Sequence, residues 1–128
     1  MKKIIFLLLF LVFITGCTVK NINDEDNNQT RFILLGKFIS PQTGSDKTSI
    51  TFSTENKAGA LSKILTILDK YGLNMSYIDS RPSKKVLGEY VFYIDFEGHI
   101  YDDSVIKAFE EIKPMSKMFY VIGSYHKI

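Results

Sequence analysis

The sequence is poor in the residues that build cross-links and metal sites. It has 128 residues but a single cysteine, Cys17, so no disulfide can form within the chain. Its two histidines, His99 and His126, form no cluster with metal-ligand spacing. His99 follows a glycine in a predicted turn and His126 lies near the C-terminus, and both are expected to be solvated. No metal site and no cofactor site is therefore predicted.

An excess of charge of one sign is also lacking. Sixteen basic residues face 14 acidic ones, and the formal net charge of +2 argues against a nucleic-acid-binding surface. The apolar run over residues 4–14 is shorter than the roughly 20 residues that a transmembrane helix needs. A length of 128 residues predicts one small domain with a short additional segment.

The N-terminal 17 residues have the layout of a secretory signal peptide. Lys2 and Lys3 precede the apolar run, and Thr15-Gly16-Cys17 follow it. Ile14-Thr15-Gly16-Cys17 also resembles the lipobox of bacterial lipoproteins, in which the cysteine is lipidated. Two interpretations stay open: a leader over residues 1–17 that anchors the protein to a membrane through Cys17, or a buried strand or helix of a truncated domain.

Hydrophobic periodicity predicts four strands and two helices in the remainder of the chain. The strands are expected over residues 49–54, 74–80, 89–96 and 118–124. The first helix carries an apolar stripe of Leu61, Ile64, Leu65, Leu68 and Tyr71 and ends at Gly72. The second carries Val105, Ala108, Phe109 and Ile112, with Asp102-Asp103-Ser104 at its start and Pro114 just past its end.

This βαββαβ order predicts the ferredoxin-like α+β plan, an antiparallel sheet with two helices on one face. The expected strand order is 4-1-3-2, which makes the second and fourth strands the edges. Residues 74–78 carry neither Lys nor Pro, which usually blunt such edges. Pairing of this strand with its copy would give a homodimer.

Two short segments carry the candidate ligand chemistry. Gly59-Ala60-Leu61 lie where a helix begins, so unpaired N–H groups at the positive end of the dipole suit a carboxylate. Gly59 lets a ligand approach the backbone closely. Asp79-Ser80-Arg81-Pro82 lie where a strand ends, since Pro82 holds the preceding residue extended. Taken alone, the two segments are also explained by a turn glycine and a strand-breaking proline.

Several motifs occur in order and identify a family. They are Asn56-Lys57-Ala58-Gly59-Ala60-Leu61, Asn74, Asp79-Ser80-Arg81-Pro82-Ser83-Lys84-Lys85, the run from Glu89 to His99, and Gly123-Ser124-Tyr125. Over residues 48–126 they closely resemble the regulatory ACT domain of prephenate dehydratases. In that family the Gly-Ala-Leu and Glu-Ser-Arg-Pro segments form the site for L-phenylalanine, the feedback inhibitor. Asp79 stands where the family usually has Glu, and Ala58 where it often has Pro.

The resemblance implies an effector site for L-phenylalanine. Its expected residues are Gly59, Ala60, Leu61, Asn74, Asp79, Ser80, Arg81 and Pro82. Amides near Gly59 would bind the carboxylate, and Asn74 or nearby carbonyls the ammonium. Leu61, Met75 and Ile78 are expected to line the apolar slot, whereas the aromatic residues of strand 89–96 are expected in the core. Whether Arg81 contacts a ligand or pairs with Asp79 is left open.

Residues 18–47 resemble a linker and the last strand of the dehydratase catalytic domain. Thr30, in Thr30-Arg31-Phe32, matches an active-site threonine of that family, but about thirty residues cannot build a catalytic cavity. No turnover is expected from this chain alone. Three hypotheses remain: a phenylalanine-sensing regulatory module, a split dehydratase with a separate catalytic chain, and a lipid-anchored extracytoplasmic amino-acid-binding or interaction protein. The family resemblance implies the cytoplasm, and the leader implies a membrane anchor.

Overall fold

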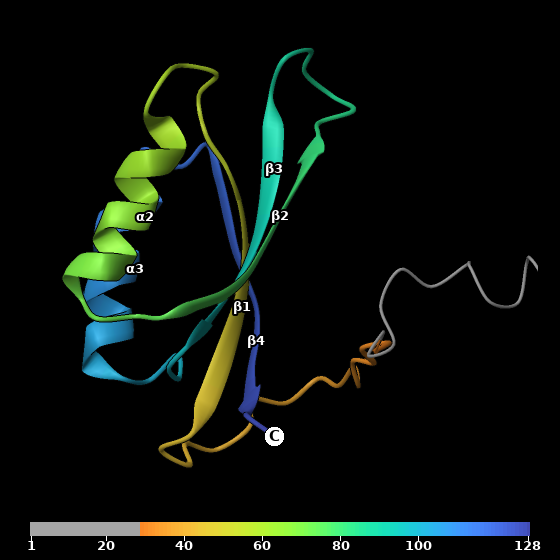
Figure 1. Ribbon diagram of the computed structural model, residues 1–128, viewed down its shortest axis with the longest axis vertical. Coiled ribbons are helices and arrows are strands. Elements are labelled where there is room, and N and C mark those ends of the chain that lie inside the picture. Colours follow the sequence, from red (N-terminus) through yellow and green to blue (C-terminus); the bar gives the residue numbers. More distant parts are fainter. Residues whose placement is uncertain (1–28) are drawn as a thin grey trace, which may run out of the picture. The chain divides into compact units, whose positions relative to one another are not determined.

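The computed structural model describes residues 29–128 of the chain (Figure 1). The predictions for the leader over residues 1–17 and for Cys17 lie outside the described residues. One structural unit ends at Gly36 and the other runs from Lys37 to Ile128. No helix within residues 29–128 is long and apolar enough to cross a membrane.

The unit from Lys37 to Ile128 contains the predicted βαββαβ order. Its elements are β1 (Asp46–Ser53), α2 (Ala60–Lys70), β2 (Met75–Pro82), β3 (Tyr90–Glu97), α3 (Asp103–Met115) and β4 (Met118–His126). All strand pairs are antiparallel and the sheet order is β2-β3-β1-β4. The predicted fold class and strand order are therefore confirmed, with β2 and β4 at the edges.

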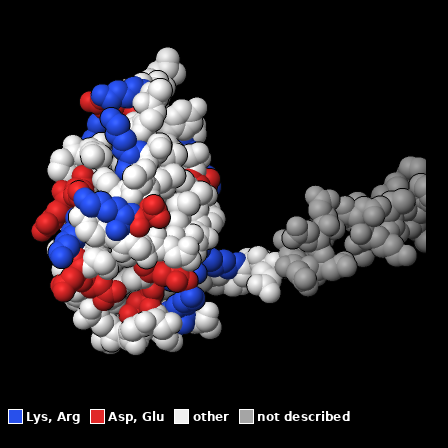
Figure 2. Space-filling view, turned by 60° about the vertical axis from the view of Figure 1, so that its left-hand side comes forward, with Lys and Arg blue, Asp and Glu red and all other residues white. Residues whose placement is uncertain are grey.

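Both helices cover one face of the sheet, and the core lies between these two layers (Figure 1). The sheet contributes Ile50, Phe52, Ile94 and Phe96, which alternate with residues of the opposite face. The helices contribute Ile64, Ile67, Leu68, Val105, Ala108, Phe109 and Ile112. The two predicted helical stripes thus bury their central residues against one side of the sheet, while the outer helical surface carries charges of both signs (Figure 2).

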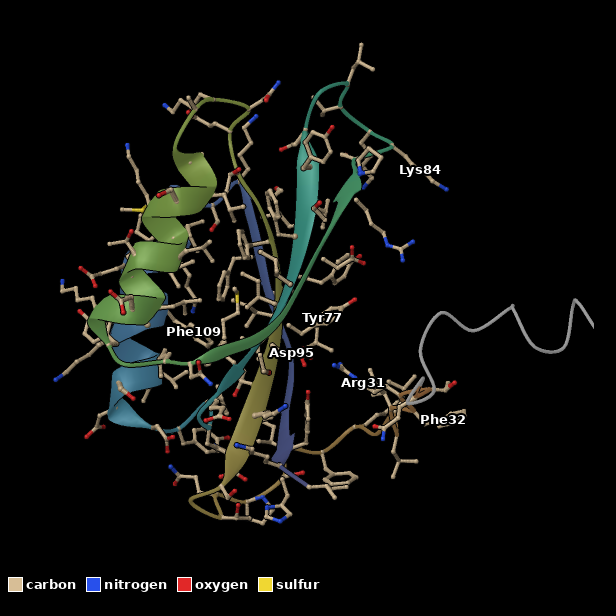
Figure 3. All side chains as sticks on the ribbon, in the orientation of Figure 1. Arg31, Phe32, Tyr77, Lys84, Asp95 and Phe109 are labelled. Carbon is tan, nitrogen blue, oxygen red and sulfur yellow. The ribbon has the colours of Figure 1, made fainter. Side chains whose placement is uncertain are left out.

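Phe109 lies between α3 and the sheet (Figure 3). Its ring meets Phe96 edge-on at a centroid distance of 5.9 Å and Phe119 at 5.1 Å, geometries that aromatic pairs favour. Asp95 lies between the core residues Ile94 and Phe96, so its side chain points to the opposite face, as does that of its cross-strand partner Tyr77.

Several element boundaries differ from the prediction by one to three residues, and two of them have a clear structural reason. β1 begins at Asp46, three residues before the predicted start, because Asp46 and Lys47 already pair with His126 and Tyr125. Pro114 was predicted just past the second helix, but α3 includes it and ends at Met115. A proline in the last turn removes one N–H donor, and Ser116 Oγ donates to the carbonyl of Ile112 at 2.9 Å at this helix end.

The prediction of two solvated histidines is wrong for His99. Its side chain is 0% exposed, whereas His126 is exposed as expected. His99 Nε2 lies 2.7 Å from the carbonyl oxygen of Ser40, so residues that precede β1 help to enclose the ring. The two residues are 59 positions apart, so no local sequence pattern predicts this contact.

Residues 29–36 contain no helix and no strand, although the family resemblance implies a strand here. A strand needs a neighbour that satisfies its backbone groups, and the sheet order shows four strands that all lie within residues 46–126. Thr30 is exposed, as are Phe32, Leu34 and Leu35.

Candidate effector site

The start of α2 has the backbone features of an anion site. Gly59 is the N-cap residue, and its φ of 82° is left-handed, which explains the glycine. The first i to i−4 bond of the helix joins the N–H of Lys63 to the carbonyl of Gly59 at 3.1 Å, and no side chain of the described residues caps the helix. The backbone N–H groups of Leu61 and Ser62, in the first turn, therefore have no carbonyl partner within the helix and can donate to another acceptor.

A cavity of about 210 Å³ opens at this helix start. It is lined by Thr54, Glu55, Asn56, Lys57, Gly59, Ala60, Leu61, Ser62, Gly88, Tyr90 and Phe92. One wall is apolar, because Leu61 of α2 faces the aromatic residues Tyr90 and Phe92 of β3. Phe92 is stacked on the core residue Phe52 with ring centroids 5.4 Å apart, so this wall is rigidly supported.

Tyr90 and Phe92 were assigned to the core by the sequence, but both line this cavity. Tyr90 is half exposed and Phe92 is partly buried. Tyr90 is the first residue of β3, whereas Phe92 packs against the core as well as lining the cavity. Alternation identifies the face of the strand on which a residue lies, but it does not give the length of strand that a helix covers.

An ion pair lies at the rim of the cavity. Lys57 Nζ is 2.6 Å from Glu55 Oε2, and both side chains are largely exposed. The hydrogen bond from Lys57 lowers the pKa of the Glu55 carboxyl, and the same bond raises the pKa of Lys57. Both groups are charged at neutral pH, so the rim presents a cation and an anion together. Sequence reasoning assigned neither residue to the site, although Lys57 belongs to the quoted family motif and Glu55 directly precedes it.

Residues Asp79 to Pro82 lie along β2, beside the aromatic wall. Pro82 pairs with Tyr90 and Ser80 pairs with Phe92 in the β2–β3 ladder. Arg81 Nε lies 3.5 Å from Asp79 Oδ2, and the N–H of Ser80 donates to Asp79 Oδ1 at 2.9 Å. This segment is therefore adjacent to the wall of the cavity, and within one chain its two charges pair with each other.

Asn74 lies at the opposite end of α2. It lines a second cavity of about 400 Å³ together with Leu65, Leu68, Asp69, Gly72, Leu73 and Met75. A helix of 11 residues is about 16 Å long, so α2 separates Asn74 and Met75 from Gly59. Ile78 pairs with Ile94 and is partly exposed. One chain does not bring Asn74 and Met75 to the helix-start cavity.

The fold is that of a ferredoxin-like α+β domain with a cavity at the start of α2. Residues 48–114 match the ACT domain, and the chain belongs to that family. It is homologous to the C-terminal region of prephenate dehydratases.

The similar proteins are much longer than this chain. It is 45% identical over 108 residues to a bifunctional chorismate mutase/prephenate dehydratase of Aquifex aeolicus, covering 84% of this chain and 30% of that protein. It is 35% identical over 107 residues to a prephenate dehydratase of Amycolatopsis methanolica, and the match covers 81% of this chain and 35% of that protein. The chain thus spans about a third of the length of these relatives.

A solved structure is similar over the same region. The crystal structure of prephenate dehydratase from Arthrobacter aurescens in complex with L-Phe has a TM-score of 0.66 and 35% sequence identity. The similarity covers 72% of this chain and 30% of the Arthrobacter chain.

Proposed function

We propose that this chain is an amino-acid-sensing regulatory domain that binds L-phenylalanine at the start of α2. The observation that carries the proposal is the cavity of about 210 Å³, which sets an uncapped helix start against an apolar wall. The amides of Leu61 and Ser62 would hold the carboxylate, and the phenyl ring would lie against Leu61, Tyr90 and Phe92. The Arthrobacter relative, which was crystallised with L-Phe, supports this choice of ligand.

The size of the cavity supports a small ligand. Pockets for drug-sized molecules usually measure about 300–1,000 Å³, so this cavity suits a single amino acid better than a larger metabolite. Glu55 provides a carboxylate at the rim for an ammonium group, and Lys57 provides a cation for a carboxylate. A zwitterionic ligand would find a partner for each of its charges there.

A second chain would complete the site through β2. In antiparallel pairing of β2 with its copy, the strand direction reverses. A twofold axis near Ile78 would then set Asn74 beside Pro82 of the partner subunit, and so beside the cavity that adjoins Tyr90. The expected effector residues Asn74 and Asp79 to Pro82 would thereby come from two chains around each ligand. Ligand binding would then strengthen dimerisation by linkage.

Calorimetric titration of the chain with L-phenylalanine tests the proposal. We expect a Kd between about 1 μM and 1 mM, equivalent to about −8 to −4 kcal/mol. Gly59→Val should weaken binding at least tenfold, because the new side chain would stand where the ligand approaches. A Cβ added at Gly59 would meet no protein atom within 4 Å. The substitution therefore strains only the backbone, whose φ of 82° suits glycine.

Gly123→Val is the control for an added side chain. A Cβ at Gly123 also meets no protein atom within 4 Å, and Gly123 lies in β4, outside the cavity. This variant should bind L-phenylalanine within about threefold of the unchanged chain. Heat with an unrelated ligand and none with L-phenylalanine would refute the proposed function.

A further inference from the structure

The segment that precedes β1 is held against the domain by hydrogen bonds of side chains. This entry strap comprises residues 40–46 and ends where β1 begins. Three hydrogen bonds that involve side chains join it to distant parts of the fold. They link Ser40 O to His99 Nε2 at 2.7 Å, Gln42 Nε2 to Asp102 Oδ1 at 2.8 Å, and Thr43 Oγ1 to His126 Nδ1 at 3.0 Å.

His99 is the buried member of this set. The backbone N–H of Tyr101 can only donate, so His99 Nδ1, at 3.1 Å, accepts from it. The carbonyl of Ser40 can only accept, so Nε2 carries the proton and donates. The neutral imidazole thus satisfies both contacts at once, and with Ser40 in place His99 is 0% exposed.

The strap is also ordered internally. Asp46 accepts the N–H of Thr43 at 2.8 Å and the Thr43 hydroxyl at 2.7 Å, which holds the pKa of the Asp46 carboxyl below its usual range. The N–H of Ser45 donates to Thr43 Oγ1 at 3.2 Å. These two amides therefore report whether the strap keeps its internal order.

A short path of backbone bonds joins the strap to Asn74. The N–H of Glu97 donates to the Asn74 carbonyl at 2.9 Å, and the next amide, that of Gly98, donates to the Asp46 carbonyl at 2.8 Å. The residue after Gly98 is His99. Asn74 and the strap are thus held by three consecutive residues, of which the first, Glu97, ends β3 and the other two follow it.

We propose that His99 is a positioning residue that latches the entry strap to the domain and couples its closure to the effector site. The coupling rests on the proposed function. A ligand that orders Asn74 also orders Glu97 to His99, and this stabilises the closed strap. The fraction of molecules with a closed strap then depends on ligand occupancy.

Hydrogen exchange of the full chain tests the latch, read by NMR at the amides of Thr43, Ser45 and Lys127, the last of which donates to the Ser45 carbonyl at 2.8 Å. His99→Ala should speed exchange at these amides about tenfold, the effect of losing a well-formed hydrogen bond, while amides in the centre of β1 and β3 stay protected. Ile112→Val is the control for a general loss of stability, since it removes one buried methyl group from the core and does not touch the strap. Unchanged exchange at the three amides in a folded His99→Ala chain would overturn the proposal.

Gln42→Ala provides a second test if His99→Ala does not fold. Gln42 is exposed, and its loss should speed exchange at Thr43 and Ser45, whereas Gln29→Ala, an exposed glutamine outside the strap, should not. Equal behaviour of the two variants would contradict the latch. Saturating L-phenylalanine should slow exchange at Thr43 and Ser45 at least threefold. Calorimetric binding without this slowing would overturn the coupling alone, whereas absence of binding would overturn the proposed function and leave the latch result standing.

Discussion

Asp79 and Arg81, two residues apart on the edge strand β2, form an ion pair with Nε and Oδ2 3.5 Å apart. Every second residue of a strand lies on the same face of the sheet, which brings these two side chains together. Both side chains are substantially exposed, so the solvent weakens their attraction.

Arg81→Ala should therefore change the free energy of unfolding by less than about 1 kcal/mol. Urea unfolding measures this difference, and Lys84→Ala, which removes an exposed cation from the adjacent hairpin, is the control (Figure 3). A loss above about 2 kcal/mol for Arg81→Ala alone would mean that the guanidinium has a structural role beyond this pair.

Phe109→Ala should destabilise the domain by about 3–5 kcal/mol, because it removes a ring that contacts Phe96 and Phe119 in the core. Ile106→Ala is the comparison on the same helix. Phe109 is 6% exposed and Ile106 is 42% exposed, so the second substitution should cost less than about half as much. Thermal or urea unfolding gives both values, and equal costs would contradict the assignment of the buried face of α3.

Stability should fall in acid partly through Glu111. Lys70 Nζ of α2 lies 2.8 Å from Glu111 Oε1 of α3, and this hydrogen bond lowers the pKa of the Glu111 carboxyl below 4.5 in the folded state. The contribution of this pair to the free energy of unfolding is complete above the pKa of Glu111 in the unfolded chain. It disappears as the pH falls through the lower pKa of Glu111 in the folded chain. Glu111→Gln should flatten the stability profile below pH 5 in urea melts. A variant whose profile matches that of the unchanged chain would show that this pair does not govern the acid limb.

Tyr77→Pro should shift a dimer toward monomer, because proline in β2 removes an N–H donor and introduces a residue that blocks strand pairing. Sedimentation velocity at tens of micromolar protein measures the shift, with circular dichroism to verify the fold. Tyr120→Pro makes the same change on the other edge, β4, and should leave the dimer intact. The reverse pattern would place the interface on β4. A monomer in the unchanged chain, with and without L-phenylalanine, would exclude dimerisation.

The fold was predictable because its signals are local. The helical spacing of Ile64 and Leu68 and the alternation of Ile50 and Phe52 each arise within one element, and all four residues are buried. The burial of His99 was not predictable, because it depends on Ser40, 59 residues away. Likewise, the cavity gathers Gly59 and Gly88, which only the packing of α2 beside the β2–β3 hairpin brings together.

The leader over residues 1–17 stays a prediction. Cell fractionation of the chain and of Cys17→Ser would test it, since only a lipidated cysteine would hold the unchanged chain in the membrane fraction. Thr30 likewise remains a family match, because its expected strand is not formed.

The separation of Gly59 and Asn74 by the length of α2 has a consequence for dosage. If each ligand needs Gly59 from one chain and Asn74 from another, half-saturation depends on the abundance of the protein as well as on the amino acid. A cell that makes little of the chain would respond only at high phenylalanine, and greater expression would move the threshold downward. The level of expression would then set the sensitivity of the sensor without any change in its sequence.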